Sequence, residues 1–294
     1  MTLWPAIAAH IAAATGEPFA NPRRRSAGGG CISSTEVLEA GGRRYFVKLN
    51  EAARHDMFAA EAEGLAEIAA SRSVRVPAPI CHGSAAGRAY LVLEHLELDG
   101  GAGGSGARLG ERLAAMHRHS AERFGWRRDN TVGSTPQVNT ESADWLAFWR
   151  ERRLRFQLEL AGRNGYNGGL QRQGDVLMAG LGVFFNDYRP QPSLLHGDLW
   201  GGNHGVLRGG EPVIFDPAVY YGDREADIAM TELFGGFGGD FYSAYRSAWP
   251  LDAGYRVRRT LYNLYHILNH LNLFGGGYRG QAQRMLDELV SELR

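Results

Sequence analysis

The chain has 294 residues, with 32 basic and 32 acidic side chains, so its formal net charge at pH 7 is zero. A balanced charge gives no field that would favour nucleic acid or an anionic membrane, and neither is expected as a partner. The composition, 44% hydrophobic and 22% charged, is that of a globular protein with a sizeable core. No apolar run reaches the roughly 18–20 residues of a membrane span, and no signal-peptide core opens the chain. Its two cysteines, Cys31 and Cys81, are far apart and indicate neither a metal site nor a disulfide, which favours a cytoplasmic location.

The first third of the chain is predicted to combine helices with a small antiparallel sheet. Gly41-Gly42 separates two strand-like segments and predicts a hairpin. The segment after the hairpin is rich in Ala and Glu, and Gly64 is its one breaker, so it predicts a helix. In chain order we expect a helix over residues 2–14, strands over Cys31–Glu39 and Arg43–Leu49, a helix over 51–70 and a strand over Tyr90–Leu93.

The remainder, from Leu109 onward, is predicted to be mainly helical. Residues 144–161 and 254–274 carry apolar side chains at helical spacing; the first stripe contains Trp145, Trp149, Phe156 and Leu160. The 40 glycines cluster mostly between periodic segments, and the cluster at 100–106 is a candidate boundary. Strands followed by helices are the order of an α+β, bilobal protein-kinase-like fold, with a β-rich lobe over residues 1–96 and a helical lobe over 97–294. Another α+β protein would give the same order of elements, so the motifs have to decide between the two.

The segment from Leu194 to Pro217 contains the most informative spacing in the sequence. Asp198 is followed after five residues by Asn203, and after thirteen more by Asp216, which ends an apolar, strand-like run. Phosphoryl transfer needs a carboxylate beside the attacking hydroxyl and oxygen ligands for the metal on the triphosphate. Kinases place these groups on one loop and on the strand-turn that follows. The spacing therefore predicts a kinase that uses ATP and Mg²⁺, with Asp198 as general base and Asn203 and Asp216 as metal ligands.

A second constellation lies near the N-terminus. Gly28, Gly29 and Gly30, followed by Cys31, form a run in which backbone amides can approach phosphate oxygens closely. Lys48 follows on the next predicted strand, where kinases place the lysine that holds the α- and β-phosphates. Glu61 and Glu63 both lie on the helix after it, and one of them is expected to orient the lysine. No Gly-Lys-Ser/Thr ends the glycine run, so this is not a Walker-type loop.

Two further positions are candidate ligand contacts. The strand that contains Leu93 runs into Glu94 and Leu96, whose backbone groups would meet the adenine at a hinge between lobes. Trp200 lies beside the predicted base, where its indole could support a sugar or a cationic substrate. The alternative for Trp200 is plain packing.

Other polar residues are predicted to support the site. His196 is expected to orient the loop by hydrogen bonding, and Asp223 and Asp227 are expected to brace it by accepting backbone N–H bonds. The helical histidines, including His117, His266 and His270, are expected to be core or surface residues and not ligands.

Several segments resemble the fructosamine kinase (ketosamine-3-kinase) family, and they are collinear from about residue 27 to the C-terminus. They are Gly-Gly-Gly-Cys-Ile-Ser, Tyr-Phe-Val-Lys-Leu-Asn, Leu-Leu-His-Gly-Asp-Leu-Trp-Gly-Gly-Asn, Phe-Asp-Pro-Ala-Val-Tyr-Tyr-Gly-Asp-Arg-Glu, Glu-Leu-Phe-Gly-Gly-Phe and the stretch from 261 to 275. The resemblance implies a protein-kinase-like fold and ATP-dependent phosphorylation of the sugar 3-hydroxyl of ketosamines. These substrates are free small molecules or adducts on glycated proteins, and the phosphorylated product releases the amine.

The same resemblance assigns roles to individual residues. It implies that Asp198 is the base, that Asn203 and Asp216 bind the metal, and that Lys48 and Glu61 clamp the phosphates. Cys31 matches a family cysteine that serves as a redox handle in some members; a small buried side chain is the alternative. We expect a monomer or a weak dimer.

Two other functions are compatible with the motifs. A phosphotransferase for an aminoglycoside, choline or homoserine would need the same base and metal ligands. Trp200 with Gly201-Gly202 beside the base favours a sugar adduct instead. A nucleotide-binding pseudokinase is the more distant alternative, and the presence of Lys48, Asp198, Asn203 and Asp216 speaks against it.

Overall fold

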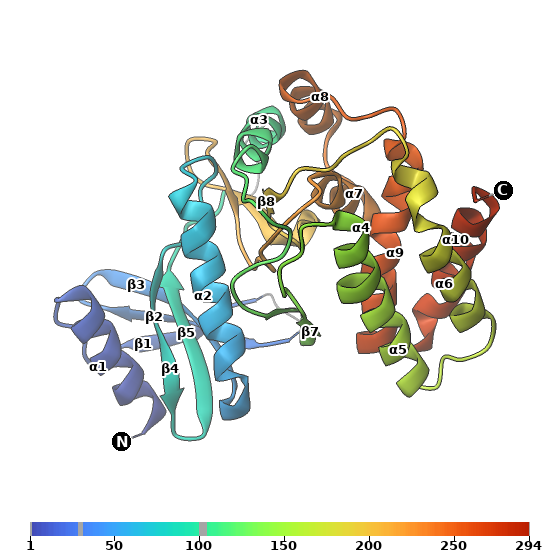
Figure 1. The fold of residues 1–294 in the computed structure, drawn as a ribbon. Helices are drawn as coiled ribbons and strands as arrows, with labels where there is room; N and C mark the ends of the chain where they lie inside the picture. Colours follow the sequence, from blue (N-terminus) through green and yellow to red (C-terminus); the bar gives the residue numbers. More distant parts are fainter. Residues whose placement is uncertain (1, 29–31, 100–104, 294) are drawn as a thin grey trace. The chain divides into compact units, whose positions relative to one another are not determined.

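The computed structural model describes residues 2–28, 32–99 and 105–293. The chain forms two compact units, one made of residues 1–105 with 204–217 and one made of 106–203 with 218–294. Residues 204–217 thus group with the N-terminal part, although the sequence-based proposal assigned them to the lobe 97–294. The fold class is the expected one, an α+β chain with an antiparallel sheet in the first unit and mostly helices in the second (Figure 1).

The first unit is built around a sheet of five antiparallel strands in the order β1-β2-β3-β5-β4. The predicted hairpin is confirmed: β2 and β3 are joined by Gly41 and Gly42, whose φ angles of 57° and 75° suit a tight primed turn. The elements of the first unit are α1 (Leu3–Thr15), β1 (Arg23–Ser26), β2 (Ser34–Ala40), β3 (Arg43–Glu51), a 3₁₀ turn (Ala52–Arg54), α2 (His55–Ala70), β4 (Pro79–Ala85), β5 (Arg88–Glu94), β9 (His204–Val206) and β10 (Pro212–Ile214).

The side chains of β3 point alternately to the two faces of the sheet. Tyr45, Val47 and Leu49 pack in the cluster that contains Ile7 and Ile11 of α1. Successive side chains of a strand point to opposite faces, so Lys48 turns away from this cluster. Helix α2 contacts β4 and β5 on that other face, and Figure 1 shows α1 and α2 on either side of the sheet.

The hairpin of β9 and β10 belongs to the first unit because it is hydrogen-bonded to it at two points. The amide of Ile214 donates to the carbonyl of Arg75 at 3.0 Å, and the amide of Asp99 donates to the carbonyl of Val206 at 2.6 Å. Gly205 lies against the Leu98 side chain, where a Cβ atom would come within 2.9 Å. These contacts fix the strand that leads to Asp216.

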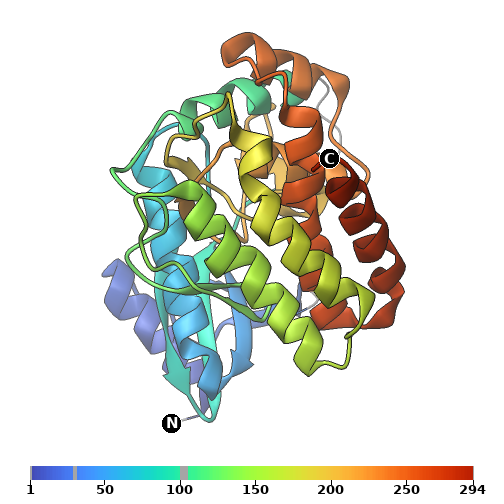
Figure 2. The ribbon, with the colours of Figure 1, turned by 45° about the vertical axis from the view of Figure 1, so that its right-hand side comes forward.

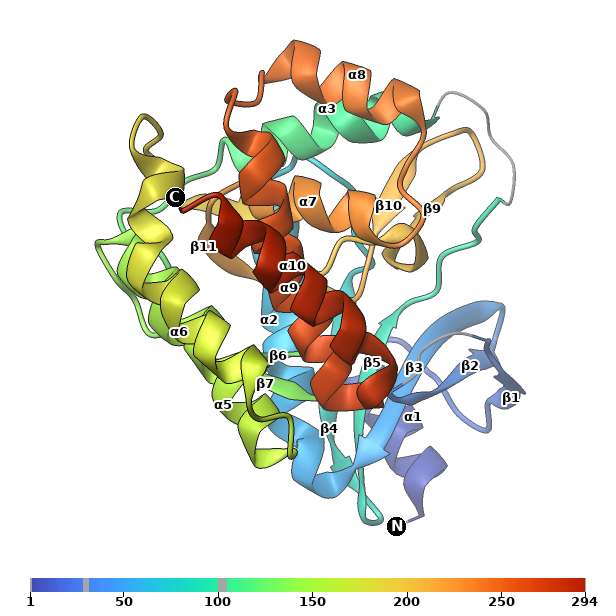
Figure 3. The same ribbon diagram turned by 90° about the vertical axis from the view of Figure 1, so that its right-hand side faces the viewer.

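The second unit is assembled around the long helix α9 (Tyr255–Phe274), which packs against α5, α7 and α10. Figures 2 and 3 show these helices from two sides. The other elements are α3 (Ser105–His117), β6 (Asn130–Val132), β7 (Thr135–Gln137), α4 (Trp145–Phe148), a π-helix (Trp149–Arg155), α5 (Phe156–Arg163), α6 (Gly169–Gly180), a 3₁₀ turn (Leu181–Phe185), β8 (Ser193–Leu195), a 3₁₀ turn (Gly201–Asn203), β11 (Tyr220–Gly222), α7 (Glu225–Leu233), α8 (Gly239–Ala248), a 3₁₀ turn (Gly276–Tyr278) and α10 (Arg279–Ser291).

The helix predicted over residues 144–161 is present, but its buried stripe differs from the predicted one. Trp145 and Trp149 are buried as expected, whereas Phe156 and Leu160 are only half-buried. The π turns insert extra residues per turn, and the buried positions that follow include Arg153 and Gln157. Apolar periodicity could not reveal the whole buried face, because two of its residues, Arg153 and Gln157, are polar.

None of the helices in residues 2–28, 32–99 and 105–293 is both long and apolar enough to cross a membrane.

Candidate active site

Lys48 lies between two carboxylates in the first unit. Its Nζ is 2.7 Å from Oε1 of Glu61 on α2 and 2.9 Å from Oδ1 of Asp216. Burial alone would lower the pKa of Lys48, but the charges of Asp216 and Glu61 outweigh it and raise that pKa. Burial raises the pKa of Glu61, and the Lys48 ammonium opposes this shift. Of the two glutamates that the sequence offered, Glu61 is therefore the partner of the lysine.

Asp216 combines a constrained backbone with an accessible side chain. Its φ of 58° lies in the left-handed region, where Asp occurs more often than most residues but still at a cost. The side chain is 37% exposed although it pairs with Lys48. An accessible carboxylate, held in a disfavoured conformation at the end of a strand, is suited to contact a ligand.

The predicted phosphate loop is described only in part. Gly29, Gly30 and Cys31 lie outside the described residues, while Gly28 is exposed and has open space around its Cα atom. On the strands that flank the loop, Thr35 donates its hydroxyl to the carbonyl of Ala27 at 2.7 Å. Asn50 donates to the carbonyl of Ile32 at 3.3 Å. These two side chains hold both ends of the glycine segment, a role that the sequence analysis missed.

The predicted hinge residues lie at and just beyond the end of β5. The amide of Glu94 donates to the carbonyl of Ala78 at 2.8 Å, and its carboxylate pairs with Arg75. Leu96 follows two residues after the strand and is half-buried. A contact between their backbone groups and adenine remains a proposal.

In the second unit, the loop after β8 holds Asp198 and Asn203 together. The Asn203 amide group donates to the backbone carbonyl of Asp198 at 2.9 Å and to its Oδ2 at 3.4 Å. Gly197, with φ of 81°, turns the chain where a Cβ atom would lie 2.1 Å from the carbonyl oxygen of Ala218. Only glycine fits this position.

The same loop is hydrogen-bonded to Asp227 on α7. Its carboxylate accepts the amide of His196 at 2.7 Å and the amide of Gly197 at 2.8 Å. It also contacts Nε2 of His117 at 3.1 Å, and all of these groups are buried. Burial would raise the pKa of Asp227, but the hydrogen bond and charge of His117 outweigh it and lower that pKa, so the carboxylate stays ionised. The predicted bracing role of Asp227 is therefore confirmed.

His196 is also placed as predicted. Its ring is fully buried, and Nδ1 accepts the amide hydrogen of Asp198 at 3.3 Å. It orients the loop and does not itself face solvent.

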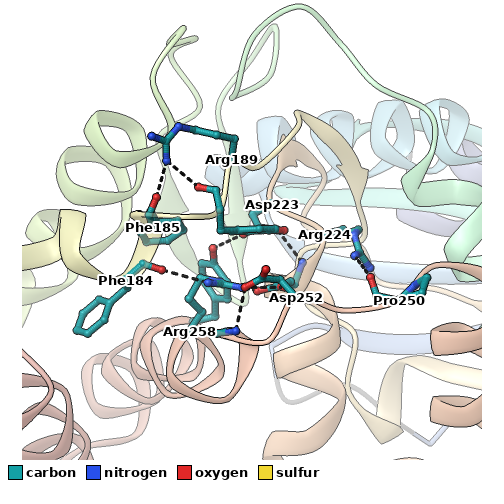
Figure 4. Close-up of polar contacts among 12 residues, drawn as sticks. Phe184, Phe185, Arg189, Asp223, Arg224, Pro250, Asp252 and Arg258 are labelled. Carbon is teal, nitrogen blue, oxygen red and sulfur yellow. Dashed lines mark hydrogen bonds and ion pairs between the residues drawn. The ribbon is translucent and has the colours of Figure 1, made fainter.

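Asp223 differs from the prediction, because its hydrogen bonds do not reach the loop. It accepts the hydroxyl of Tyr188 at 2.8 Å, the hydroxyl of Tyr262, and the amide of Glu225 at 3.0 Å. Figure 4 shows Asp223 within a polar cluster that also contains Arg258 and Asp252. Asp223 therefore accepts a hydrogen bond from the first residue of α7 and belongs to that polar cluster. The prediction that it braces the loop was wrong.

Trp200 is 39% exposed, and its indole covers Gly202. A Cβ atom on Gly202 would lie 2.3 Å from the indole ring, so the glycine is needed for this side-chain position. The ring packs edge-on against Phe234, with centroids 6.4 Å apart. Trp200 is thus packed on one side and accessible on the other, and its contact with an acceptor stays a prediction.

The donor set fits a magnesium nucleotide better than a metal held by protein alone. Within the described part of the chain, no group of three or more His, Cys, Asp and Glu side chains could hold a metal ion. Mg²⁺ in kinases is held by one or two protein oxygens and by the phosphates. In the first unit, the exposed Asp216 carboxylate is accessible to such an ion. In the second unit, the side-chain oxygen of Asn203 is available as a ligand, because the amide nitrogen is the atom used within the loop.

Comparison with known proteins identifies the family. The model of the family described as fructosamine kinase matches residues 3–292. The chain belongs to the fructosamine kinase family. A probable ketoamine kinase from Synechocystis is 51% identical over 288 residues, which cover 98% of this chain and 97% of the relative. The chloroplastic protein-ribulosamine 3-kinase of Arabidopsis thaliana is 43% identical over 272 residues, covering 92% and 83%.

Solved structures support the same assignment. A Haemophilus somnus structure assigned as a fructosamine-3-kinase has a TM-score of 0.88 and 28% identity, covering 96% of each chain. The aminoglycoside phosphotransferase APH(4)-Ia, in a complex with AMP-PNP and hygromycin B, has a TM-score of 0.62 at 13% identity, covering 98% of each chain. At that identity the likeness shows the fold alone, which is protein-kinase-like. As a member of the fructosamine kinase family the chain is a kinase, and its family implies ATP as the phosphoryl donor.

Proposed function

We propose that this fructosamine kinase family member transfers the γ-phosphate of MgATP to the 3-hydroxyl of ketosamines, the sugar adducts of amines such as the lysine side chain. The observation that carries the proposal is the Asp198 loop, in which Asn203 bonds to Asp198 and Asp227 clamps the two preceding amides. The fructosamine kinase family match supplies the substrate class.

In this proposal Asp198 receives the proton of the sugar hydroxyl as O3 forms its bond to the γ-phosphorus and the bond to the ADP oxygen breaks. Lys48, held by Glu61, binds the phosphate oxygens. Asp216 and Asn203 would hold Mg²⁺, which would supply neutralisation of charge on the triphosphate. Glu94 and Leu96 contribute backbone contacts to adenine, and Trp200 contacts the acceptor.

The product chemistry gives the proposal a distinctive readout. A ketosamine that carries phosphate on C3 can enolise toward C1, after which the C3–O bond breaks and phosphate leaves. Hydrolysis of the remaining adduct then frees the amine. ADP should therefore appear first, and inorganic phosphate and free lysine should follow after a delay.

The test is an ADP-release assay with fructosyl-lysine, ribulosyl-lysine, choline and kanamycin, each with and without Mg²⁺. We expect turnover of the two ketosamines only, dependent on the metal, with delayed release of phosphate and lysine. Since one relative is named for ribulosamines, ribulosyl-lysine should be turned over faster. ADP formation with choline or kanamycin alone would move the protein to another acceptor class. Nucleotide binding without turnover of any acceptor would indicate a pseudokinase.

A further inference from the structure

Five aromatic rings form a continuous row in the second unit, beginning beside the predicted base. Consecutive centroid distances are 6.4 Å from Trp200 to Phe234, 4.7 Å from Phe234 to His270, and 5.4 Å from His270 to Phe274. Tyr278 closes the row, 5.1 Å from His270 and 6.4 Å from Phe274. We call these five residues the aromatic wall.

Two of the five rings of the aromatic wall are exposed to solvent, and the other three, Phe234, His270 and Tyr278, are half-buried. Phe274 is 51% exposed and Trp200 is 39% exposed, whereas Tyr262 and Tyr265 of the same helix are buried. His270 and Phe274 are four residues apart on α9, so they share one helix face. Phe234 follows the last residue of α7, and the wall thus joins the ends of two helices to the Asp198 loop. Exposed rings in a connected row beside a reactive group indicate a binding surface.

His270 gives the wall a polar atom without adding a charge. Its Nδ1 lies 2.8 Å from the carbonyl oxygen of His266, one turn earlier on α9. A carbonyl can only accept, so Nδ1 carries the hydrogen. Burial lowers the pKa of His270, so the ring is neutral near pH 7. In this tautomer Nε2 is a hydrogen-bond acceptor.

These properties match the amine-borne half of a ketosamine. That half consists of a secondary ammonium and the carbon chain or ring of the parent amine. Ring faces attract an ammonium group and pack against its methylenes, and a neutral imidazole nitrogen accepts an N–H. Binding an ammonium in this way requires no carboxylate, and none of the five residues of the wall carries one. Because Trp200 is two residues from Asp198, a sugar whose hydroxyl faces Asp198 could extend its amine end along the wall.

We propose that the aromatic wall binds the amine-borne part of the acceptor and selects adducts of long or aromatic amines over those of small amines. This inference rests on the proposed ketosamine kinase function. Trp200 and Phe234 lie nearest the ammonium, and Phe274 and Tyr278 contact the far end of the amine. The outer two rings should therefore determine which amine is preferred, with no effect on the sugar or on ATP.

The test compares fructosyl adducts of methylamine, lysine and benzylamine in the wild type, in Phe274→Ala and in Tyr278→Ala. The loss of one ring contact should raise KM for the lysine and benzylamine adducts about two- to tenfold. KM for the methylamine adduct and for ATP should stay at the wild-type value. Val176→Ala is the matched control, because Val176 is a 50% exposed apolar side chain on α6 of the same unit.

The outcomes separate this inference from the function on which it rests. An equal loss for all three adducts, or no change for any of them, in a wild type that phosphorylates ketosamines would overturn the selectivity role of the wall. A wild type that phosphorylates no ketosamine would overturn the proposed function and this inference together. A thermal melt of each variant shows whether a loss reflects unfolding.

Discussion

At the level of single residues, the grouping of Lys48, Glu61 and Asp216 explains why a buried charge is tolerated here. An unpaired ammonium in the interior would be neutralised by desolvation, but two carboxylates within hydrogen-bond distance keep it charged. When all three groups are ionised, the cluster carries one more negative than positive charge. It would repel a bare triphosphate and suits a nucleotide that arrives with a divalent cation.

The most direct prediction for a single residue concerns the replacement of Asp198. Asp198→Asn keeps the size of the side chain and removes its ability to accept a proton. We expect kcat to fall by about 10²–10⁴-fold, the usual contribution of general-base catalysis and positioning. ATP affinity, measured by calorimetry with Mg²⁺ present, should remain close to wild type, because the proposed mechanism assigns Asp198 to the acceptor and not to the nucleotide. If the variant retained more than about a tenth of wild-type kcat, Asp198 would not be the base.

At the level of elements, the catalytic loop owes its shape to α7. Asp227 on this helix accepts two successive loop amides, and His117 of α3 supports the carboxylate from the other side. A buried carboxylate that accepts three hydrogen bonds stays ionised and keeps one orientation. The loop is therefore anchored by buried polar contacts, while the side chain of Trp200 on the same loop is 39% exposed.

This arrangement predicts a kinetic effect for Asp227→Asn. An asparagine has one accepting oxygen, so its NH₂ group must face either the Gly197 amide or the His196 amide together with His117, and at least one bond is lost. A buried donor without a partner costs about 1–3 kcal/mol, which should shift the loop and lower kcat about ten- to a hundredfold. KM for ATP should change little. The measurement is steady-state kinetics normalised to folded protein.

Asp223→Asn provides the matched control for Asp227→Asn. Both residues are buried aspartates near the start of α7, but the bonds of Asp223 go to Tyr188, Tyr262 and Glu225. This variant should lose stability and keep the kcat of its folded fraction. Equal losses of kcat in the two variants would mean that Asp227 acts through the stability of α7 and not through the loop.

Helices, strands and motifs could be predicted from the sequence more reliably than the contacts between buried polar side chains could. The motifs predicted Lys48, Asp198 and Asp216 as site residues, because phosphoryl transfer restricts which residue types can serve, and the structure pairs Lys48 with Asp216. The sequence did not separate Asp223 from Asp227, since which carboxylate reaches the loop depends on how α7 packs. The buried Arg153 in the π-helix was missed for a related reason, because its partners lie far away in sequence. The aromatic wall was missed because rings at helical spacing normally predict a core.

At the scale of the whole molecule, a largely buried ionic cluster links several elements of the second unit (Figure 4). Arg258 of α9 binds Glu225 of α7 through two hydrogen bonds, of 2.7 and 3.2 Å, and Asp252 at 2.6 Å. It also donates to the carbonyl of Phe184 at 3.1 Å. One guanidinium thus ties together two helices and two connecting segments. Burial, together with the neighbouring Asp223, raises the pKa of Glu225 to about 7, although Arg258 opposes the shift.

This cluster gives a prediction for Arg258→Met. Removing one partner of a buried ion pair leaves uncompensated carboxylates, and the free energy of unfolding should fall by about 3–5 kcal/mol. Arg259→Met is the control on the same helix. Arg259 is 43% exposed and pairs with Glu232, so its loss should cost less than about 1 kcal/mol. Urea unfolding of both variants measures the difference.

The stability loss of Arg258→Met should also depend on pH in a defined direction. Glu225 has a folded-state pKa above its unfolded value, and the loss of the guanidinium raises it further. Between those two pKa values the folded state binds more protons than the unfolded state, so stability falls as pH rises through the window. The variant should therefore lie closest to wild type near pH 5 and furthest from it near pH 8. Glu225→Gln in the Arg258→Met background removes the titrating carboxyl, and it should recover part of the stability at pH 8 and flatten the profile. A loss in Arg258→Met that is constant from pH 5 to pH 8 would show that Arg258 stabilises the unit by packing and not by compensating the buried carboxylates.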